Sequence, residues 1–300
     1  MRRPIVACLL VLSGLAGGGT VRADDAGPVW ALRGSGGGTV YLAGSVHVLD
    51  AARSALPAGF AIAYRDAERL VMEIDMDDLD PLAAASFLAA RGSFTDGETL
   101  RAILEPARYA RIDAAARTLG LPLDSVAQLE PWAVALGLTQ LQLAKLGLDP
   151  QSGVEQQITA WARRDGKPIA GLESVEEQLG VLDGLSYADQ ARFLELTVDE
   201  ADSMPSELDR LLAAWRRGDT RILEQLLLEE YEKMPTLYRP LVADRNRRWL
   251  PQIEALTKRA DDTLVVVGAL HLVGPEGLLA LLRSRGVSPG PVDTRRPTPP

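Results

Sequence analysis

The apolar residues of the chain fall into two patterns, short runs typical of strands and longer stretches with helical spacing. Two short runs, Val29–Arg33 and Thr39–Ser45, flank the turn "GSGGG" and predict a β-hairpin. Further apolar runs predict strands at residues 70–74, within "KPIAGLES", and at residues 263–267, the last of them fully buried. Predicted strands therefore occur along most of the chain rather than in one block.

The remaining apolar residues recur at the spacing of helices. This pattern covers "LPAGFAIAYRDAERL", residues 81–161 with interruptions, and residues 175–258. Residues 275–285 predict a closing helix with a proline in its first turn. Strands separated by helices predict an α/β fold, a single domain with a large helical insertion rather than two independent domains.

The two ends of the chain differ from this pattern. The first 23 residues have the layout of a secretory signal peptide: Arg2 and Arg3, an apolar run at residues 5–15, and small residues that end at Ala23. The apolar run is well short of the roughly 20 residues that a membrane-spanning helix needs, and no other stretch is long enough. We therefore expect a signal peptide at residues 1–23, cleaved after Ala23, one domain at residues 24–287 and a frayed Pro-rich tail at residues 288–300. The mature protein would be periplasmic or secreted and would have no stable membrane span.

Composition narrows the possible functions. The chain has 300 residues, of which 47% are hydrophobic, enough for a large core. Cleavage after Ala23 would remove the single cysteine, Cys8, which excludes a disulfide or a thiol nucleophile in the mature protein. It would also remove three of the 32 basic residues and no acidic residue, so the net charge would change from -9 to -12. An acidic chain without a basic cluster is a poor binder of nucleic acid or anionic lipid.

The chain has two histidines, and both stand in the same local setting. His47 ends "VYLAGSVH" and His271 ends "LVVVGALH", each three residues after a glycine, Gly44 or Gly268. A glycine there permits close approach of backbone, and the N–H groups exposed at such a strand exit can bind a carboxylate or an oxyanion. Ser45 lies two residues before His47, but it lacks the Gly-x-Ser-x-Gly setting of a serine nucleophile.

Four of the predicted strands run into a histidine or a glutamate: His47, Glu73, Glu173 and His271. In open α/β sheets, sites form outside the carboxyl ends of the strands, so strands of like polarity would bring these side chains together. Two imidazoles and two carboxylates suit a divalent metal ion or general acid–base chemistry. Asp75 would point the same way as Glu73 on an extended chain and could join them. The alternative is structural, with hydrogen-bonded histidines and glutamates that mark where strands meet solvent.

Taken together, these motifs resemble the TraB/GumN family, which belongs to a clan with the Tiki proteases and the erythromycin-esterase-like proteins. Besides the paired GxxH motifs, four segments agree in order: "LVMEID", "SGVEQQITAWARRDGKPIAGLES", "ADRNRRWLPQIEAL" and "VVVGALHLVGPEGLLALL". The resemblance covers about residues 29–287 and implies a mixed β-sheet surrounded by helices. Asp244 and Glu155 depart from the residues that are commoner in the family at their positions. The site residues that the resemblance implies are His47, Glu73, Glu173, Arg245, Asn246 and His271.

The resemblance implies hydrolysis, by a metal ion in the Tiki-like relatives and by a histidine base in the esterase-like relatives. Our leading hypothesis is an exported hydrolase, in the form of a metal-dependent peptidase. His47 and His271 would be neutral ligands of a divalent metal ion, whose bound water would have a pKa of about 7. One of Glu73 and Glu173 would be the third ligand and the other the general base. Arg245 or Asn246 would stabilise the oxyanion.

Two other functions remain open. A metal-independent esterase would use one histidine as general base on water, with activity rising near pH 6–7 and no response to chelators. A non-catalytic exported protein would use both histidines to bind a ligand or an ion. The sequence leaves the substrate open as a peptide or a small molecule.

Overall fold

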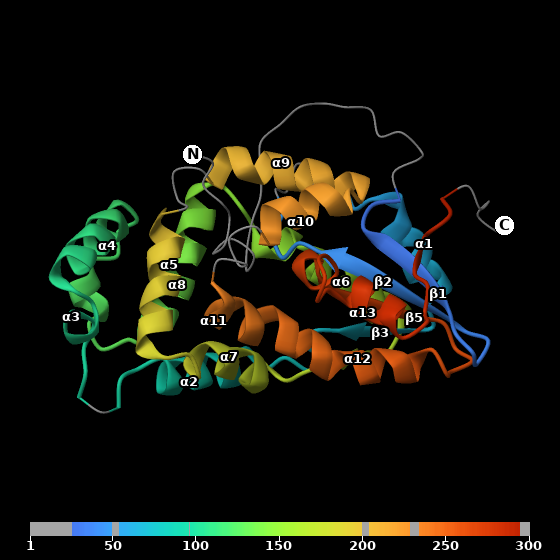
Figure 1. Cartoon of the computed structure of the whole chain (residues 1–300), viewed down its shortest axis with the longest axis horizontal. Helices are drawn as coiled ribbons and strands as arrows, with labels where there is room; N and C mark the ends of the chain where they lie inside the picture. Colours follow the sequence, from blue (N-terminus) through green and yellow to red (C-terminus); the bar gives the residue numbers. More distant parts are fainter. Residues whose placement is uncertain (1–25, 50–53, 96, 200–203, 229–233, 295–300) are drawn as a thin grey trace.

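A computed structural model describes residues 26–49, 54–95, 97–199, 204–228 and 234–294, which form a β-sheet surrounded by helices (Figure 1). The sheet has six strands in the order β4-β3-β5-β2-β1-β6. In β2, β5, β3 and β4 neighbouring strands are parallel, whereas β1 is antiparallel to β2 and β6 is antiparallel to β1. The strands are β1 Val29–Arg33, β2 Thr39–Ser45, β3 Arg69–Met72, β4 Ile169–Gly171, β5 Thr263–Gly268 and β6 Gly290–Pro291.

The predicted mixed α/β fold is confirmed, as are the hairpin β1–β2 and the strands β3, β4 and β5. The predicted strand at residues 70–74 ends earlier, at Met72. Beyond Met72 the segment pairs with the residues after β4 only through single hydrogen bonds. One of them is donated by the Glu173 N–H to the Glu73 carbonyl at 3.0 Å. The side chains that follow β3 and β4 are therefore placed at the end of the sheet.

Helices connect the strands and build a large lobe beside the sheet (Figure 1). The two long stretches of helical periodicity are confirmed as series of helices rather than single ones. The helices are α1 Ala58–Asp66, α2 Pro81–Arg91, α3 Leu100–Ile103, α4 Pro106–Thr118, η3 Leu123–Val126, α5 Pro131–Lys145, η4 Pro150–Ser152, α6 Val154–Asp165, α7 Val175–Asp183, α8 Tyr187–Asp199, α9 Met204–Arg217, α10 Thr220–Leu228, α11 Pro235–Tyr238, η6 Arg239–Ala243, α12 Asp244–Leu256, η7 Ala269–His271 and α13 Leu278–Ser284.

The start of the closing helix differs from the prediction. We expected it at residues 275–285, with Pro275 in its first turn, but α13 begins at Leu278. Gly274 has a φ of 81°, in the left-handed region, and its carbonyl accepts the Gly277 N–H at 3.2 Å. Residues 274–277 therefore form a turn that separates η7 from α13.

Both faces of the sheet are covered, as expected for strands that are largely parallel. Alternate residues of β5 belong to two separate hydrophobic clusters: Leu264 and Val266 to one, Val265 and Val267 to the other. The first cluster includes side chains of α1 and α6 and extends into the helical lobe. The second cluster contains side chains of α12 and α13. The central strand is thus buried on both faces, as the sequence predicted.

Part of the predicted Pro-rich tail is ordered, so this prediction is wrong in part. Gly290 and Pro291 pair with β1, and Val292 is buried against the main core. The Val292 N–H donates to the Val29 carbonyl at 3.1 Å. A proline is tolerated here because β6 is the edge strand, where one side needs no hydrogen-bond donor.

The predicted signal peptide at residues 1–23 lies outside the described residues. Among the described helices, none has the length and apolar character needed to cross a membrane.

Candidate functional site

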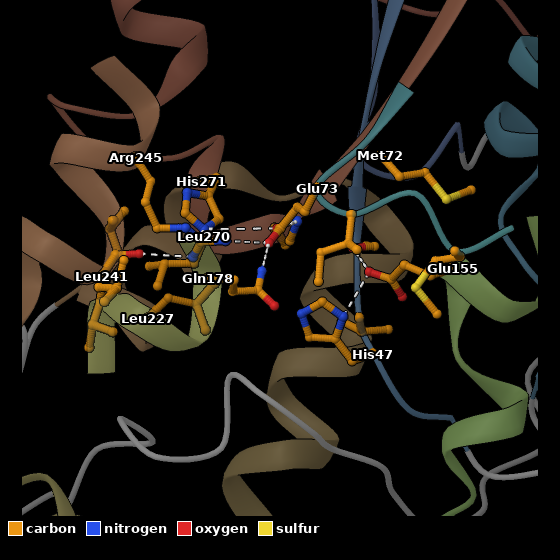
Figure 2. A pocket seen from close by; sticks show the side chains of 18 of the residues that line it. His47, Met72, Glu73, Glu155, Gln178, Leu227, Leu241, Arg245, Leu270 and His271 are labelled. Atoms are coloured by element: carbon orange, nitrogen blue, oxygen red, sulfur yellow. Dashed lines mark hydrogen bonds and ion pairs between the residues drawn. The ribbon is translucent and has the colours of Figure 1, made fainter. Parts of the chain in front are cut away.

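The parallel strands end around one cavity of about 340 Å³. His47, Glu73, Arg245 and His271 line it, and Figure 2 shows Glu73 between His47 on one side and Arg245 with His271 on the other. Two of these side chains follow strands, β2 for His47 and β3 for Glu73, His271 belongs to η7 directly after β5, and Arg245 comes from the first turn of α12. Glu173 and Asn246 lie behind Arg245 and His271 and hydrogen-bond to them. The structure therefore brings all six predicted site residues together.

Arg245 is the centre of the buried part of the site. Its Nη2 donates to Glu73 Oε2 at 2.7 Å and to Glu173 Oε1 at 2.6 Å, and its Nε donates to Glu173 Oε1 at 3.0 Å. Its Nη1 donates to the Leu241 carbonyl at 3.0 Å and lies 3.1 Å from His271 Nε2. All five N–H groups of the guanidinium thus have acceptors within the protein. Arg245 supplies a positive charge to the site but no free donor for an oxyanion.

His271 is held as a neutral imidazole. The Asn246 amide nitrogen donates to the carbonyls of His271 and Glu276, which turns its oxygen toward His271 Nδ1 at 2.7 Å. Nδ1 therefore carries the proton, and Nε2 accepts from Arg245. Burial, with the charges of Arg245 and His47, lowers the pKa of His271 to about 3. The lone pair of His271 faces Arg245, so this histidine is not placed to take a proton from a substrate.

His47 is held in the opposite state. Its Nδ1 lies 2.8 Å from Glu155 Oε1, which also accepts a hydrogen bond from the Ser45 hydroxyl. Burial lowers the pKa of His47, but the attraction of Glu155 outweighs it, and the pKa rises to about 9. The pKa of Glu155 is lowered in turn, because His47 and the Ser45 hydroxyl outweigh the effect of burial. His47 is therefore an imidazolium at neutral pH, with Nε2 as its free donor.

The start of α6 places Glu155 against His47. Gly153 precedes the helix, and a Cβ on it would lie 2.0 Å from the His47 carbonyl oxygen, so only glycine allows this approach. The Val154 N–H donates to the Val46 carbonyl at 3.1 Å. Glu155 then falls in the first helical turn, where the helix dipole favours a carboxylate. The loop after β2 and the helix start are thus joined by backbone and by the His47–Glu155 pair.

Because Gly268 has no side chain, it leaves open space in the site between Glu73 and His47. A Cβ on this residue would lie 3.2 Å from Glu73 Oε1 and 3.7 Å from His47 Nε2. The Gly268 N–H donates to Glu73 Oε1 at 2.7 Å, as expected for a strand exit that binds a carboxylate. Burial raises the pKa of Glu73, but Arg245, both histidines and this N–H outweigh it and lower the pKa to about 2. Glu73 is therefore a carboxylate and a weak base.

Asp75 does not join the site, so that expectation is wrong. Its Oδ1 accepts the N–H groups of Asp77 and Asp78 at 3.0 and 3.3 Å, on the surface. The chain leaves the extended conformation after Met72, so the alternation that would align Asp75 with Glu73 no longer applies.

Three residues that contact the site residues were not identified as site residues from the sequence: Glu155, Gln178 and Trp249. Glu155 appeared there only as a departure from the family pattern. Gln178 Nε2 donates to Glu73 Oε2 at 3.1 Å and to Glu173 Oε1 at 3.2 Å. Trp249 Nε1 donates to Glu173 Oε2 at 3.2 Å. Only the positions of Gln178 and Trp249 in the sequence could have indicated them. Gln178 lies one turn into the helix after β4, and Trp249 lies one turn after Arg245.

The predicted metal ligands do not fit a metal ion as they are arranged. Arg245 hydrogen-bonds to three of the four, Glu73, Glu173 and His271, and a divalent cation there would be repelled by the guanidinium. Glu173 Oε2 also accepts a hydrogen bond from Trp249 Nε1. Among the described residues, no group of three or more His, Cys, Asp or Glu side chains is placed to hold a metal ion. The metal ion therefore stays a prediction.

Comparison with known proteins gives a family and uncharacterized relatives. The model of the TraB/PrgY/gumN family matches residues 28–290. The uncharacterized protein YbaP of Escherichia coli (strain K12) is 24% identical over 244 residues, which cover 81% of this chain and 87% of YbaP. An uncharacterized protein of Treponema pallidum (strain Nichols) is 22% identical over 268 residues, 85% of this chain and 80% of that protein. No solved structure matches the chain.

Proposed function

Because the chain belongs to the TraB/PrgY/gumN family and places a histidine–carboxylate pair on the wall of a cavity, we propose that it is a hydrolase in which His47 activates water without a metal ion. The observation that carries the proposal is the 2.8 Å contact of His47 Nδ1 with Glu155. A carboxylate on one ring nitrogen orients the imidazole and favours proton uptake at the other nitrogen. His47 Nε2 borders the open space beside Gly268.

We place the attacking water in that space. It donates one hydrogen to Glu73 Oε1, which has acceptor capacity left beside the Gly268 N–H, and the other to Nε2 of neutral His47. The water oxygen attacks the carbonyl carbon of the substrate while its proton moves to His47 Nε2. The bond from the carbonyl carbon to the leaving group then breaks, and the proton on Nε2 passes to the leaving group. Glu155 stabilises the imidazolium between these two transfers.

Arg245 has a different role from the one expected. Its N–H groups are all used within the protein, so it acts as a fixed charge that keeps Glu73 and Glu173 in place. Asn246 is likewise used by His271 and two carbonyls, and it orients His271.

Assays on a panel of esters and peptides, with and without EDTA, test this proposal. We expect hydrolysis that EDTA leaves unchanged, and a loss of at least about 100-fold in kcat for His47→Gln, the range for removal of a general base. Glu177→Gln, which alters an exposed helix-capping carboxylate, is the control and keeps full activity. Activity that EDTA abolishes and a divalent metal ion restores would replace this scheme with the metal-dependent one. Ligand binding without hydrolysis of any substrate would favour the non-catalytic alternative.

Export is the second part of the proposal, and it is supported by the layout of residues 1–23. Mass spectrometry of the N-terminus of protein expressed from the full sequence tests it. A mature chain that begins at Asp24 is expected, and an intact N-terminus would contradict export by this signal.

A further inference from the structure

The cavity at the site has two kinds of wall. One wall is polar and carries the strand-end residues described above. The other is apolar and comes from the helical lobe and from η6 and η7, and we call it the apolar arm. Figure 2 shows two of its residues, Leu227 and Leu241, on the Arg245 side of the cavity. Its main residues are Leu182, Phe193, Leu211, Leu227, Leu241 and Leu270.

The apolar arm leads into the protein interior. Phe193, Leu211 and Leu227 line the cavity, yet their exposed fractions are only 2%, 3% and 1%. Side chains with so little exposed surface are packed in the core, so this part of the wall is the inner end of the cavity rather than the side of an open groove. Water has few hydrogen-bond partners beside such a wall, and apolar cavities bind apolar groups in preference to water.

On this basis we propose that the substrate is an ester whose acyl part is a neutral apolar chain of medium length, held in the apolar arm. This inference rests on the proposed hydrolase function. The carbonyl carbon would lie near the open space beside Gly268, and the chain would extend along Leu241 and Leu227. Hydrolysis adds the water oxygen to the acyl carbon, breaks the acyl–oxygen bond, and returns the water proton through His47 to the alcohol.

Charge supports a neutral substrate that gives an anionic product. The site holds two positive groups, His47 and Arg245, and three carboxylates, Glu73, Glu155 and Glu173. Glu173 also pairs with the half-exposed Arg248 at 3.6 Å. Arg245 has no N–H left for a ligand carboxylate. The fatty carboxylate that forms on hydrolysis therefore meets cations that are already paired with carboxylates of the protein, which favours its release.

The size of the cavity limits the chain. An apolar cavity of 150 Å³ holds benzene, which corresponds to about 25 Å³ per carbon atom. A cavity of about 340 Å³ then has room for roughly 13 non-hydrogen atoms of that size. With the ester group and the water accounted for, an acyl chain of about six to ten carbons fits.

A series of p-nitrophenyl esters from acetate to dodecanoate tests the inference with the full protein. We expect kcat/KM to rise up to about fourfold with each added methylene, the value for burial of one methylene, and to fall again beyond about ten carbons. Hydrolysis that proceeds with the same kcat/KM for acetate and octanoate would overturn the apolar arm as the chain site while leaving the hydrolase proposal standing.

A pair of matched variants locates the chain. Leu241→Phe fills the apolar arm from a half-buried position, so we expect the preferred ester to shorten by several carbons. Leu281→Phe makes the same change at a half-buried leucine of α13 outside the cavity, and it should leave the chain-length profile unchanged. An unchanged profile in folded Leu241→Phe would contradict the assignment.

Binding of 2-alkanones separates failure of the inference from failure of the proposed function. These ketones carry the carbonyl and the chain but no leaving group, so they bind without being cleaved. We expect the Tm to rise with chain length up to about ten carbons, and to rise less in Leu241→Phe than in Leu281→Phe. If no ester is cleaved but this length dependence is present, the hydrolase proposal fails and the apolar arm stands. If the Tm is independent of chain length, the inference fails.

Discussion

His47 and His271 each follow a glycine by three residues, and the structure holds them in opposite protonation states. His47 is paired with Glu155, and the pKa of its imidazole rises to about 9. His271 is buried between the Asn246 amide and the Arg245 guanidinium, and its pKa falls to about 3. The two residues therefore differ in what their rings offer: both ring nitrogens of His271 have protein partners, whereas Nε2 of His47 borders the open space of the cavity.

The pH dependence of activity is the first prediction at this scale. His47 must lose its proton to act as a base, so kcat/KM should rise with pH through about 9 rather than through pH 6–7 as the sequence alone suggested. Glu155→Gln removes the charge that raises this pKa, while burial still lowers it, so the ascending limb should move to lower pH. A pH–rate profile of each variant gives the result, and Glu177→Gln should leave the limb in place. A limb that does not move in Glu155→Gln would exclude His47 as the titrating base.

At the scale of secondary structure, Arg245 links α12 to three elements that are distant in the sequence and to the adjacent η6. It extends from α12 to the residues that follow β3 and β4, to His271 of η7, and to the Leu241 carbonyl of η6. η6 is a π-helical segment directly before α12, a geometry often found at functional sites. The Leu241 carbonyl of this segment accepts a hydrogen bond from Arg245 Nη1 at 3.0 Å.

A double-mutant cycle measures this link. Arg245→Met leaves Glu73 without its arginine partner and Glu173 with only the half-exposed Arg248, and we expect it to lower the free energy of unfolding by about 3–5 kcal/mol. Adding Glu173→Gln removes one of these charges, so the double variant should lose less than the sum of the two single losses. Urea unfolding of the four proteins gives the interaction free energy between the two residues. If Arg245→Met does not fold, Arg245→Lys takes its place in the cycle. Additive losses would mean that the pair contributes no net interaction.

For the whole molecule, the two histidines predict how stability depends on pH. Below about 6.5 the unfolded chain protonates His271 while the folded chain does not until about pH 3, so stability falls as the pH falls through this window. His47 has a folded pKa of about 9, so its contribution is complete below 6.5 and is lost as the pH rises to about 9. Stability should therefore be greatest near pH 6.5.

Urea unfolding between pH 5 and pH 9 checks this prediction. The chain has no other histidine, so these two dominate the side-chain titration in the window. His47→Gln should flatten the alkaline side of the curve and His271→Gln the acid side, whatever each variant does to stability at pH 6.5. A curve that keeps its alkaline slope in His47→Gln would contradict the raised pKa.

The sequence by itself determined the strands, the helical stretches and the strand-end residues, because these depend on the local alternation of apolar and polar positions. It placed β5 as a buried strand and identified both GxxH histidines, Glu73 and Glu173, with the resemblance adding Arg245 and Asn246. It was wrong for Asp75 and for part of the tail, where the direction of the chain depends on which strand or turn comes next to it.

Only the tertiary structure decided what these residues contact. Glu73 and Arg245 are 172 positions apart, and no local pattern reports that the arginine uses all its N–H groups on protein acceptors. The charge of His47 depends on Glu155, which a separate helix brings to it, and the apolar arm is formed by helices whose leucines look like ordinary core residues in the sequence. The protonation states of the histidines, the suitability of the site for a metal ion and the shape of the cavity depend on contacts between residues that are distant in the sequence. They are therefore defined only in the folded chain.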